Sequence, residues 1–336
     1  MAARLSAQLL AGRPARDAVA VAERLLAVQG QDSRGFRLAV RARTEGLHAS
    51  DVDRALTEER SLIVTWVNRG TLHLIRSDDY PLLQALTTPQ LHTQSRRRLA
   101  QEGVSEGDAE RAIAELERAL AADGALTRDQ LRARIEAIGV RTERQALVHI
   151  LFAASLRGLI VRGPMAGGKH AFVLVRDWLG EQRPVERDQA LAELARRYLA
   201  GHGPATDRDL ARWAGIPLGQ ARSGLGSISS ELEEIGDELV DLKKRGPVAE
   251  LPPPRLLGPY DPVLLGWTSR EDVLGEHRHL VTVNGLFRPF AMVKGRAVGT
   301  WSMPKGKIVL ESLDRISKAD RAVLERDADD VKRFLG

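Results

Sequence analysis

The chain of 336 residues contains no cysteine, and this absence excludes several kinds of chemistry at once. Without thiols there is no disulfide, no thiolate nucleophile and no zinc or iron–sulfur site ligated by cysteine. No apolar run reaches the roughly eighteen residues that a transmembrane helix needs, so none is expected. The N-terminal segment is too polar for a secretory signal. These absences favour a cytoplasmic protein.

Sequence motifs of common enzyme classes are missing too. The chain has no P-loop, no GxGxxG after a strand, no HExxH and no GxSxG. The run MAGGKH (165–170) resembles a phosphate-binding loop only in its glycines and lysine, and a hairpin tip explains it better. His277 and His279 would bind a metal only with a third ligand nearby, so a solvated pair is the preferred interpretation. We therefore expect no metal and no cofactor.

Positive charge is in slight excess, with 50 Lys and Arg against 45 Asp and Glu and a net charge of +5. This balance is compatible with nucleic acid but does not prove binding, because arginine enrichment also fits a chain encoded by GC-rich DNA. Only clustering of the charge argues for binding. Positive charge is clustered in two segments expected to be helical. The first has Arg34, Arg37 and Arg41 on one face, and the second has Arg96, Arg97 and Arg98 in a row. For each helix a solvated charged face is as good an explanation as phosphate contact.

A set of short helices followed by a β-hairpin occurs three times along the chain. The first set has helices expected over 4–11, 16–29, 34–44 and 50–59, and then a hairpin over 61–77 with Asn68-Arg69-Gly70 as its turn. The second has helices over 109–122, 126–139 and 142–157 and a hairpin over 159–175, and the third has helices over 187–203 and 205–216, a helix from Pro217, and a hairpin over 232–242. A bridging helical stretch (78–101) joins the first two sets. Helices closed by a hairpin are typical of the winged helix, a variant of helix-turn-helix.

The proline-rich segment 248–262 marks a boundary, and the chain beyond it is rich in strands. Strands expected over 279–283, 288–293, 297–303 and 307–313 predict a small antiparallel sheet or barrel, followed by an amphipathic helix capped by Ser317 or Asp314. Thr127, with Gln130 completing a capping box, and Thr206 are predicted to begin helices. We thus predict an α+β fold: three tandem winged-helix domains (1–101, which includes the bridging helices, 102–180 and 181–247) and a barrel-like domain (248–336).

Two glutamines, Gln29 and Gln31, lie at the expected end of the helix over 16–29. An amide is uncharged and carries both donors and an acceptor, so a pair two residues apart could hold a water or support a developing positive charge without titrating. A solvated or capping side chain is the more common outcome for such a pair. Asp32 follows directly, and its simplest role is to cap the helix from Arg34, with a carboxylate beside the glutamines as the alternative.

Several stretches together resemble one family. QGQD (29–32), TWVNRGTLHLI (65–75), LLGPYDPVLLGW (256–267), NGLFRPF (284–290) and KGRAVGTW (294–301) look like the bacterial winged-helix DNA glycosylases of the AlkZ and YcaQ type. The resemblance spans nearly the whole chain, and the order of the motifs agrees as well as the motifs themselves.

The resemblance implies three winged-helix units and a β-barrel around a DNA-sized channel, and excision of alkylated purines, above all N7-alkylguanine. It implies that some members unhook interstrand crosslinks. A Gln-x-Gln or Gln-x-Asp motif carries catalysis in this family, which corresponds here to Gln29 and Gln31, with Asp32 as a helper and Gly30 where many members have a hydrophobic residue. The expected DNA-binding residues are Arg34, Arg37, Arg41, Arg69, His73, Arg96, Arg97, Arg98 and Lys169.

The leading hypothesis is therefore a monofunctional DNA glycosylase that acts as a monomer on double-stranded DNA, without a membrane partner. No lysine lies near the glutamine pair to form a Schiff base, which argues against lyase activity. Two alternatives stay open. A non-catalytic winged-helix regulator or scaffold would bind DNA without chemistry, and winged units could instead mediate protein contacts.

Overall fold

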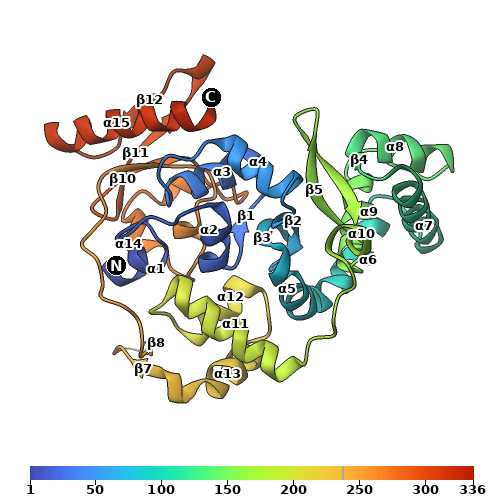
Figure 1. The fold of residues 1–336 in the computed structure, drawn as a ribbon, viewed down its shortest axis with the longest axis horizontal. Coiled ribbons are helices and arrows are strands. Elements are labelled where there is room, and N and C mark those ends of the chain that lie inside the picture. Colours follow the sequence, from blue (N-terminus) through green and yellow to red (C-terminus); the bar gives the residue numbers. More distant parts are fainter. Residues whose placement is uncertain (237) are drawn as a thin grey trace. The chain divides into compact units, whose positions relative to one another are not determined.

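The computed structural model describes residues 1–236 and 238–336 (Figure 1). Contacts divide the chain into two compact units. Unit 1 combines Met1–Val52 with Asp188–Gly336, and unit 2 is Asp53–Arg187. In the part of the chain that the structure describes, no helix is long and apolar enough to cross a membrane.

Unit 1 contains the two ends of the chain. Its helices are α1 (Ala2–Ala7), α2 (Ala18–Leu25), α3 (Ser33–Arg41), α11 (Arg187–His202), α12 (Asp207–Ala214), α13 (Leu218–Ser227), α14 (Glu271–Leu274) and α15 (Lys318–Leu335). Its strands are β1 (Val28–Gln29), β7 (Leu232–Glu234), β8 (Val240–Leu242), β9 (Arg255–Leu257), β10 (Phe290–Val293), β11 (Arg296–Ser302) and β12 (Val309–Ser312). Helix α4 (Ala49–Thr57) runs across the division between the units.

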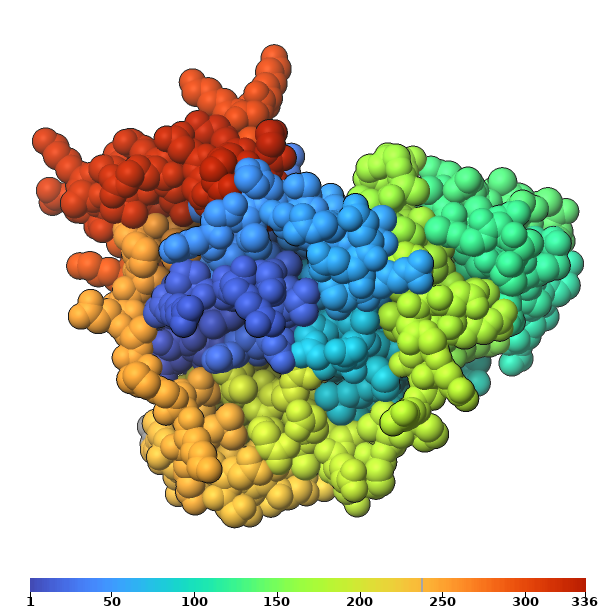
Figure 2. All heavy atoms as spheres, in the orientation of Figure 1, coloured from blue at the N-terminus to red at the C-terminus, as the bar shows by residue number. Residues whose placement is uncertain are grey.

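An antiparallel sheet with the order β12-β11-β10-β9 lies near the C-terminus of unit 1. Its core joins distant parts of the sequence, because Leu38 of α3, Trp301 of β11 and Leu324 of α15 pack in one buried cluster. The Trp301 indole N–H donates to the carbonyl of Leu257 at 2.8 Å, which ties β11 to β9. Figure 2 shows α15 and the neighbouring strand atoms (red) as one continuous layer at an edge of unit 1. The sheet is open, so the predicted closure into a barrel is not confirmed.

Three local predictions in unit 1 need correction. The helix expected over 16–29 ends at Leu25, because Leu26 takes a positive φ of 62° that an α-helix cannot continue through. The strand expected over 279–283 is a 3₁₀ turn (Arg278–Leu280) with one isolated bridge between Val281 and Phe287. The predicted linker 248–262 contains strand β9, whose leucines pair with β10.

Unit 2 consists of helices around one antiparallel sheet. The helices are α5 (Tyr80–Thr87), α6 (His92–Gln101), α7 (Glu106–Asp123), α8 (Arg128–Ala137), α9 (Ala146–Leu156) and α10 (Val175–Leu179). The strands β2 (Leu62–Val67), β3 (Thr71–Arg76), β4 (Leu126–Thr127), β5 (Ile160–Ala166) and β6 (Lys169–Leu174) pair in the order β3-β2-β5-β6-β4. The predicted hairpins over 61–77 and 159–175 are confirmed as β2–β3 and β5–β6, and the third prediction corresponds to the short hairpin β7–β8 of unit 1.

Helix starts follow the predicted chemistry closely. Thr127 and Gln130 form a capping box at α8, and Thr206 forms one with Asp209 at α12. Ser317, rather than Asp314, caps α15. The repeated order of helices and hairpin is therefore present, while the division into three winged-helix domains and a barrel-like domain remains a prediction.

Candidate functional site

The glutamine pair lies in the segment between α2 and α3, not at the end of a helix as expected. Gln29 belongs to strand β1 and is 7 % exposed, whereas Gln31 is exposed. The early end of α2 at Leu25 produces this difference, because it leaves residues 28–29 free to form a strand. One amide of the pair is thus fixed within the protein and the other is accessible to a ligand.

Asp32 is the N-cap of α3, as its simplest role predicted. Its Oδ1 accepts a hydrogen bond from the backbone N–H of Gly35 at 2.6 Å, and its backbone is extended. Such a cap satisfies a backbone donor that the helix leaves unpaired. Capping uses one oxygen of the carboxylate, so Asp32 can combine this structural role with a negative charge next to Gln31.

The loop over residues 258–262 packs closely on α3. A Cβ added at Gly35 would lie 2.6 Å from the carbonyl oxygen of Pro259, and one at Gly258 would lie 2.8 Å from the Cβ of Leu38. Real Cβ atoms do not approach other atoms so closely, so glycine is required at both positions. The 258–262 loop is thereby placed against the same helix that Asp32 begins.

A buried ion pair fixes the end of the 258–262 loop. Arg43 and Asp261 are both fully buried, and two guanidinium nitrogens of Arg43 donate to the two carboxylate oxygens at 2.8 and 3.0 Å. Gln8 accepts from the same guanidinium through its backbone oxygen at 2.8 Å and its side-chain oxygen at 3.1 Å. A buried pair with this bidentate geometry and extra hydrogen bonds holds both segments in a single arrangement.

Tyr260 is the residue that sequence reasoning missed at this site. Its φ of 58° is rare for a residue other than glycine, and such strain clusters at functional sites. Its ring packs on Phe287 with centroids 5.3 Å apart. Burial and the negative charge of Asp32 raise the pKa of its phenol, so Tyr260 is a neutral hydroxyl in the surroundings of Asp32. The run LLGPYDPVLLGW (256–267) carries the family resemblance, and that resemblance was the signal in the sequence that could have pointed to Tyr260.

The three arginines of α3 separate into different roles. Arg34 is exposed. Arg37 is mostly buried, with its guanidinium donating to the carbonyl of Ser33 at 2.6 Å and lying 4.6 Å from the ring centroid of Phe36. Arg41 is buried and paired with Asp327 and, at 2.8 Å, with Asp330 of α15. The structure therefore does not support Arg41 as a phosphate contact, since its charge holds α15 onto α3.

In unit 2, Arg69 and His73 belong to the β2–β3 hairpin. Arg69 is partly exposed at the turn. His73 is 2 % exposed, and the Nδ1 of its ring lies 2.9 Å from the carbonyl of Thr71. Burial and the charge of Arg69 lower the pKa of His73 to about 3, so the imidazole is neutral at physiological pH. A cationic contact between His73 and DNA is therefore not supported.

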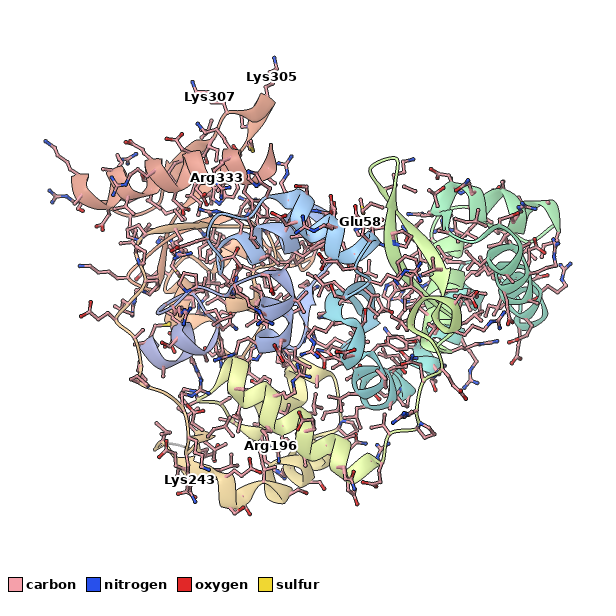
Figure 3. All side chains as sticks on the ribbon, in the orientation of Figure 1. Glu58, Arg196, Lys243, Lys305, Lys307 and Arg333 are labelled. Carbon is pink, nitrogen blue, oxygen red and sulfur yellow. The ribbon has the colours of Figure 1, made fainter. Side chains whose placement is uncertain are left out.

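The remaining cationic candidates lie on the surface of unit 2. Arg96, Arg97 and Arg98 are exposed on α6, and Arg98 donates to the side chain of Gln101 at 3.2 Å. Lys169 is at the start of β6 and forms an ion pair with Asp129 at 2.8 Å. In unit 1, Lys305 and Lys307 project from the β11–β12 turn, which sequence reasoning did not select (Figure 3).

Comparison with known proteins gives the family. The family model described as "DNA glycosylase AlkZ-like" matches residues 22–334, nearly the whole chain. The chain belongs to the AlkZ-like DNA glycosylases. A curated relative from Streptomyces sahachiroi, named an interstrand DNA cross-link repair glycosylase, is 29 % identical over 99 % of this chain and 95 % of its own length.

A solved structure agrees with this AlkZ-like assignment. The Streptomyces sahachiroi DNA glycosylase AlkZ superposes with a TM-score of 0.79 at 26 % identity, over 99 % of this chain and 95 % of that one. The mixed helix and sheet composition of the fold is thus shared with a known AlkZ. The resemblance noted from the motifs is confirmed at the level of the family.

A metal centre finds no support in the described residues, 1–236 and 238–336, because no group of three or more His, Asp or Glu side chains could hold an ion. His277 instead forms an ion pair with Asp314 at 2.8 Å, and its ring lies 6.0 Å from that of His279. The chemistry available to this AlkZ-like chain at residues 29–32 therefore consists of two amides, one carboxylate and the nearby phenol of Tyr260.

Proposed function

We propose that this AlkZ-like protein excises N7-alkylguanine-type lesions from double-stranded DNA by hydrolysing the N-glycosidic bond. The single observation that carries the proposal is the contrast within the QGQD motif. Gln31 is exposed, while Gln29 is buried and Asp32 is fixed by its hydrogen bond to α3. The amide of Gln31 is thus accessible, while the amide of Gln29 and the carboxylate of Asp32 are fixed by the protein. Such a set of groups is suited to orienting a water at a defined position.

The chemistry of the lesion matches these uncharged groups. An N7-alkylated guanine already carries a positive charge and leaves readily, so the enzyme has little need of a strong general acid. It must place a water and support a sugar that becomes cationic as the base departs. We assign the water to Gln31, and the support of the cation to Gln29 with help from the Asp32 carboxylate, because fixed dipoles and charges aimed at a developing charge are a large part of catalysis.

The reaction is proposed to stop at the abasic site. The motif and the capped start of α3 carry no lysine that could attack the sugar as an amine and continue to strand cleavage. Unhooking of interstrand crosslinks is proposed as a specialised form of the same reaction, by analogy with the Streptomyces sahachiroi relative, which is named an interstrand DNA cross-link repair glycosylase. A bulky crosslink requires an open approach to the scissile bond rather than an enclosed base pocket.

Contacts to the DNA backbone are proposed for the accessible cations. These are Arg34 at the start of α3, Arg69 on the β2–β3 turn, the three arginines of α6, and Lys169 at the tip of the β5–β6 hairpin. Arg37, Arg41 and His73 are left out. Arg37 is buried and donates to the carbonyl of Ser33, Arg41 is buried in an ion pair, and His73 is buried and neutral. The protein is proposed to bind as a monomer.

The test is excision from a duplex that contains one N7-methylguanine, read as alkali-labile abasic sites under single-turnover conditions. Removing one preorganised polar group in an active site typically costs on the order of 10²–10³ in rate. Gln31→Ala and Gln29→Ala are expected to fall in that range. Gln189→Ala, an exposed glutamine on α11 of the same unit, is the matched control and is expected to retain the wild-type rate.

The outcomes separate the candidate functions. Excision that survives both glutamine substitutions contradicts the catalytic assignment. Duplex binding without excision of any alkylated base supports the non-catalytic DNA-binding alternative. Absence of duplex binding even at low salt contradicts both and favours a protein-binding role.

A further inference from the structure

Arg162 occupies an unusual position in the sheet of unit 2. It lies on β5, opposite Val64 of β2 on one side and opposite Phe172 of β6 on the other. Its guanidinium carbon is 4.9 Å from the ring centroid of Trp66 and 5.0 Å from that of Phe172. The centroids of the two rings are 6.4 Å apart and their planes are inclined by only 17°, so the guanidinium stacks on both rings.

This guanidinium lacks the partner that a half-buried charge normally has. Its Nε is buried without a hydrogen-bond acceptor, and no carboxylate among the described residues pairs with Arg162. Burial, and next the positive charge of Arg128, lower the pKa of Arg162 to about 10, which leaves it charged at neutral pH. Arg128, exposed at the start of α8, forms no ion pair within the described parts of the chain, and its neighbour Asp129 is paired with Lys169 at 2.8 Å.

Three other arginines of unit 2 are neutralised by nearby acids. Arg157 is paired with Glu110, Arg176 with Glu117, and Arg118 with Glu115 at 2.8 Å. Arg162 instead faces a second cation, and an unpaired charge withdrawn from water lowers stability. Arg162 nevertheless stacks on the rings of Trp66 and Phe172, which are 6 % and 1 % exposed. Such an arrangement fits a site whose anion arrives with a ligand.

We infer that Arg162, stacked on Trp66 and Phe172 and accompanied by Arg128, binds a backbone phosphate of the DNA duplex. The inference rests on the proposed function, since it takes DNA as the ligand. A planar guanidinium donates two parallel hydrogen bonds to two phosphate oxygens, and stacking fixes the direction of that fork. Two like charges that are in no ion pair favour a phosphate over a base edge, because an anion between them relieves their mutual repulsion.

No cluster of charge in the sequence marks this site. Arg162 stands alone between Val161 and Gly163 in the expected hairpin, and Trp66 and Phe172 read as core residues. Only the pairing of β2, β5 and β6 brings the three side chains together.

The experiment measures the Kd for an undamaged duplex over a series of NaCl concentrations, so that it does not depend on excision. Arg162→Met keeps the length of the side chain and its contact with the rings but removes the charge. Loss of a charge-assisted hydrogen bond predicts binding about tenfold weaker or more. The slope of log K against log salt should fall by about one, and by the same amount for unrelated sequences.

Two further variants complete the test. Arg157→Met removes an exposed arginine of the same unit that is already paired, and it is expected to leave both affinity and slope unchanged. Arg162→Lys keeps the charge without the fork and should retain the slope while losing part of the affinity. If Arg162→Met fails to fold, the inference is judged on Arg162→Lys together with Arg128→Met, which should weaken binding and lower the slope.

An unchanged Kd and slope for Arg162→Met overturns the inference, and so does weaker binding with an unchanged slope, which indicates a contact to a base. Failure of the proposed function is distinguishable. A wild-type protein that binds duplex with Arg162-dependent salt sensitivity but releases no alkylated base supports the phosphate site and contradicts the glycosylase.

Discussion

Two buried regions of this protein use arginine in opposite ways. In unit 1, Arg43 is fully buried and meets Asp261 with two hydrogen bonds, and Arg41 meets Asp327 and Asp330. In unit 2, Arg162 stacks on two aromatic rings and forms no ion pair with any carboxylate that the structure describes. The paired arginines have their charge satisfied by the fold itself. The charge of Arg162 is not satisfied in this way. We therefore interpret Arg41 and Arg43 as residues that support the fold, and Arg162 as a residue that binds a ligand.

The comparison also shows why clustering of charge in a sequence is a weak guide to DNA contacts. Arg34, Arg37 and Arg41 share a helical face, yet the last is used to hold α15. Arg162 belongs to no cluster. What decides the role of an arginine is whether an acid lies within reach, and this depends on contacts between distant segments.

The largest effect is expected from Arg43→Met in unit 1. Removing one partner leaves the Asp261 carboxylate buried and uncompensated, which typically costs about 3–5 kcal/mol of unfolding free energy. Urea unfolding followed by circular dichroism measures the loss. The double variant Arg43→Met/Asp261→Leu should recover much of it, because no charge is then left buried. A single variant as stable as wild type would contradict the assigned role of the pair.

A smaller loss is expected from Arg41→Met. Its hydrogen bonds to two aspartates and to the carbonyl of Leu256 are partly buried, and hydrogen bonds to charged groups contribute about 1.5–3 kcal/mol. The matched control is Lys332→Met, which breaks the exposed ion pair of Lys332 with Asp329 on α15. Exposed pairs contribute about 0–1 kcal/mol, so equal losses for the two variants would refute the distinction.

His73 of unit 2 is a buried titratable group that is uncharged, in contrast to the buried arginines of the two units. Its pKa is about 3 in the folded protein, below the ordinary 6.5, so the unfolded chain binds the proton more readily. The stability it contributes is present above pH 6.5 and is lost as the pH falls towards 3. Between pH 7 and pH 5 the loss is about 2 kcal/mol. His73→Gln should remove this part of the pH dependence in urea unfolding, and an unchanged slope would exclude His73 as its source.

The smallest effect on stability is expected from Arg162→Met, the variant for which we expect a large loss of DNA binding. Arg162→Met should change the unfolding free energy by less than about 1 kcal/mol, because replacing an uncompensated charge by an apolar chain of similar size is often neutral or stabilising. Thermal unfolding without DNA measures it. A loss as large as that of Arg43→Met would show that Arg162 serves the fold, and would remove the contrast between the two regions.

Local chemistry predicted much of the fold. Capping at Thr127, Thr206 and Ser317 depends on residues three positions apart, and the hairpin turn at Asn68-Arg69-Gly70 depends on neighbours, so these features could be identified from short windows. The family was identifiable for a different reason, because motifs in a fixed order along the chain do not require knowledge of their contacts.

Features that depend on distant contacts were not predicted. The 258–262 loop was interpreted as part of a linker, because its prolines and glycine give no local sign that Asp261 pairs with Arg43. Tyr260 was missed for the same reason, and the burial of Arg41 follows from acids of α15. The glutamine pair was located in the sequence, but the place of Gln29 on strand β1 follows from the end of α2 at the positive φ of Leu26, which no residue type in that segment signals.

The division of unit 1 between the two ends of the chain has a consequence for biosynthesis. The ribosome makes residues 29–32 before Asp261, which anchors the loop over α3 and follows Arg43 by 218 residues. A nascent chain that stops short of Asp261 therefore carries the glutamine motif without the ion pair that holds this loop against α3.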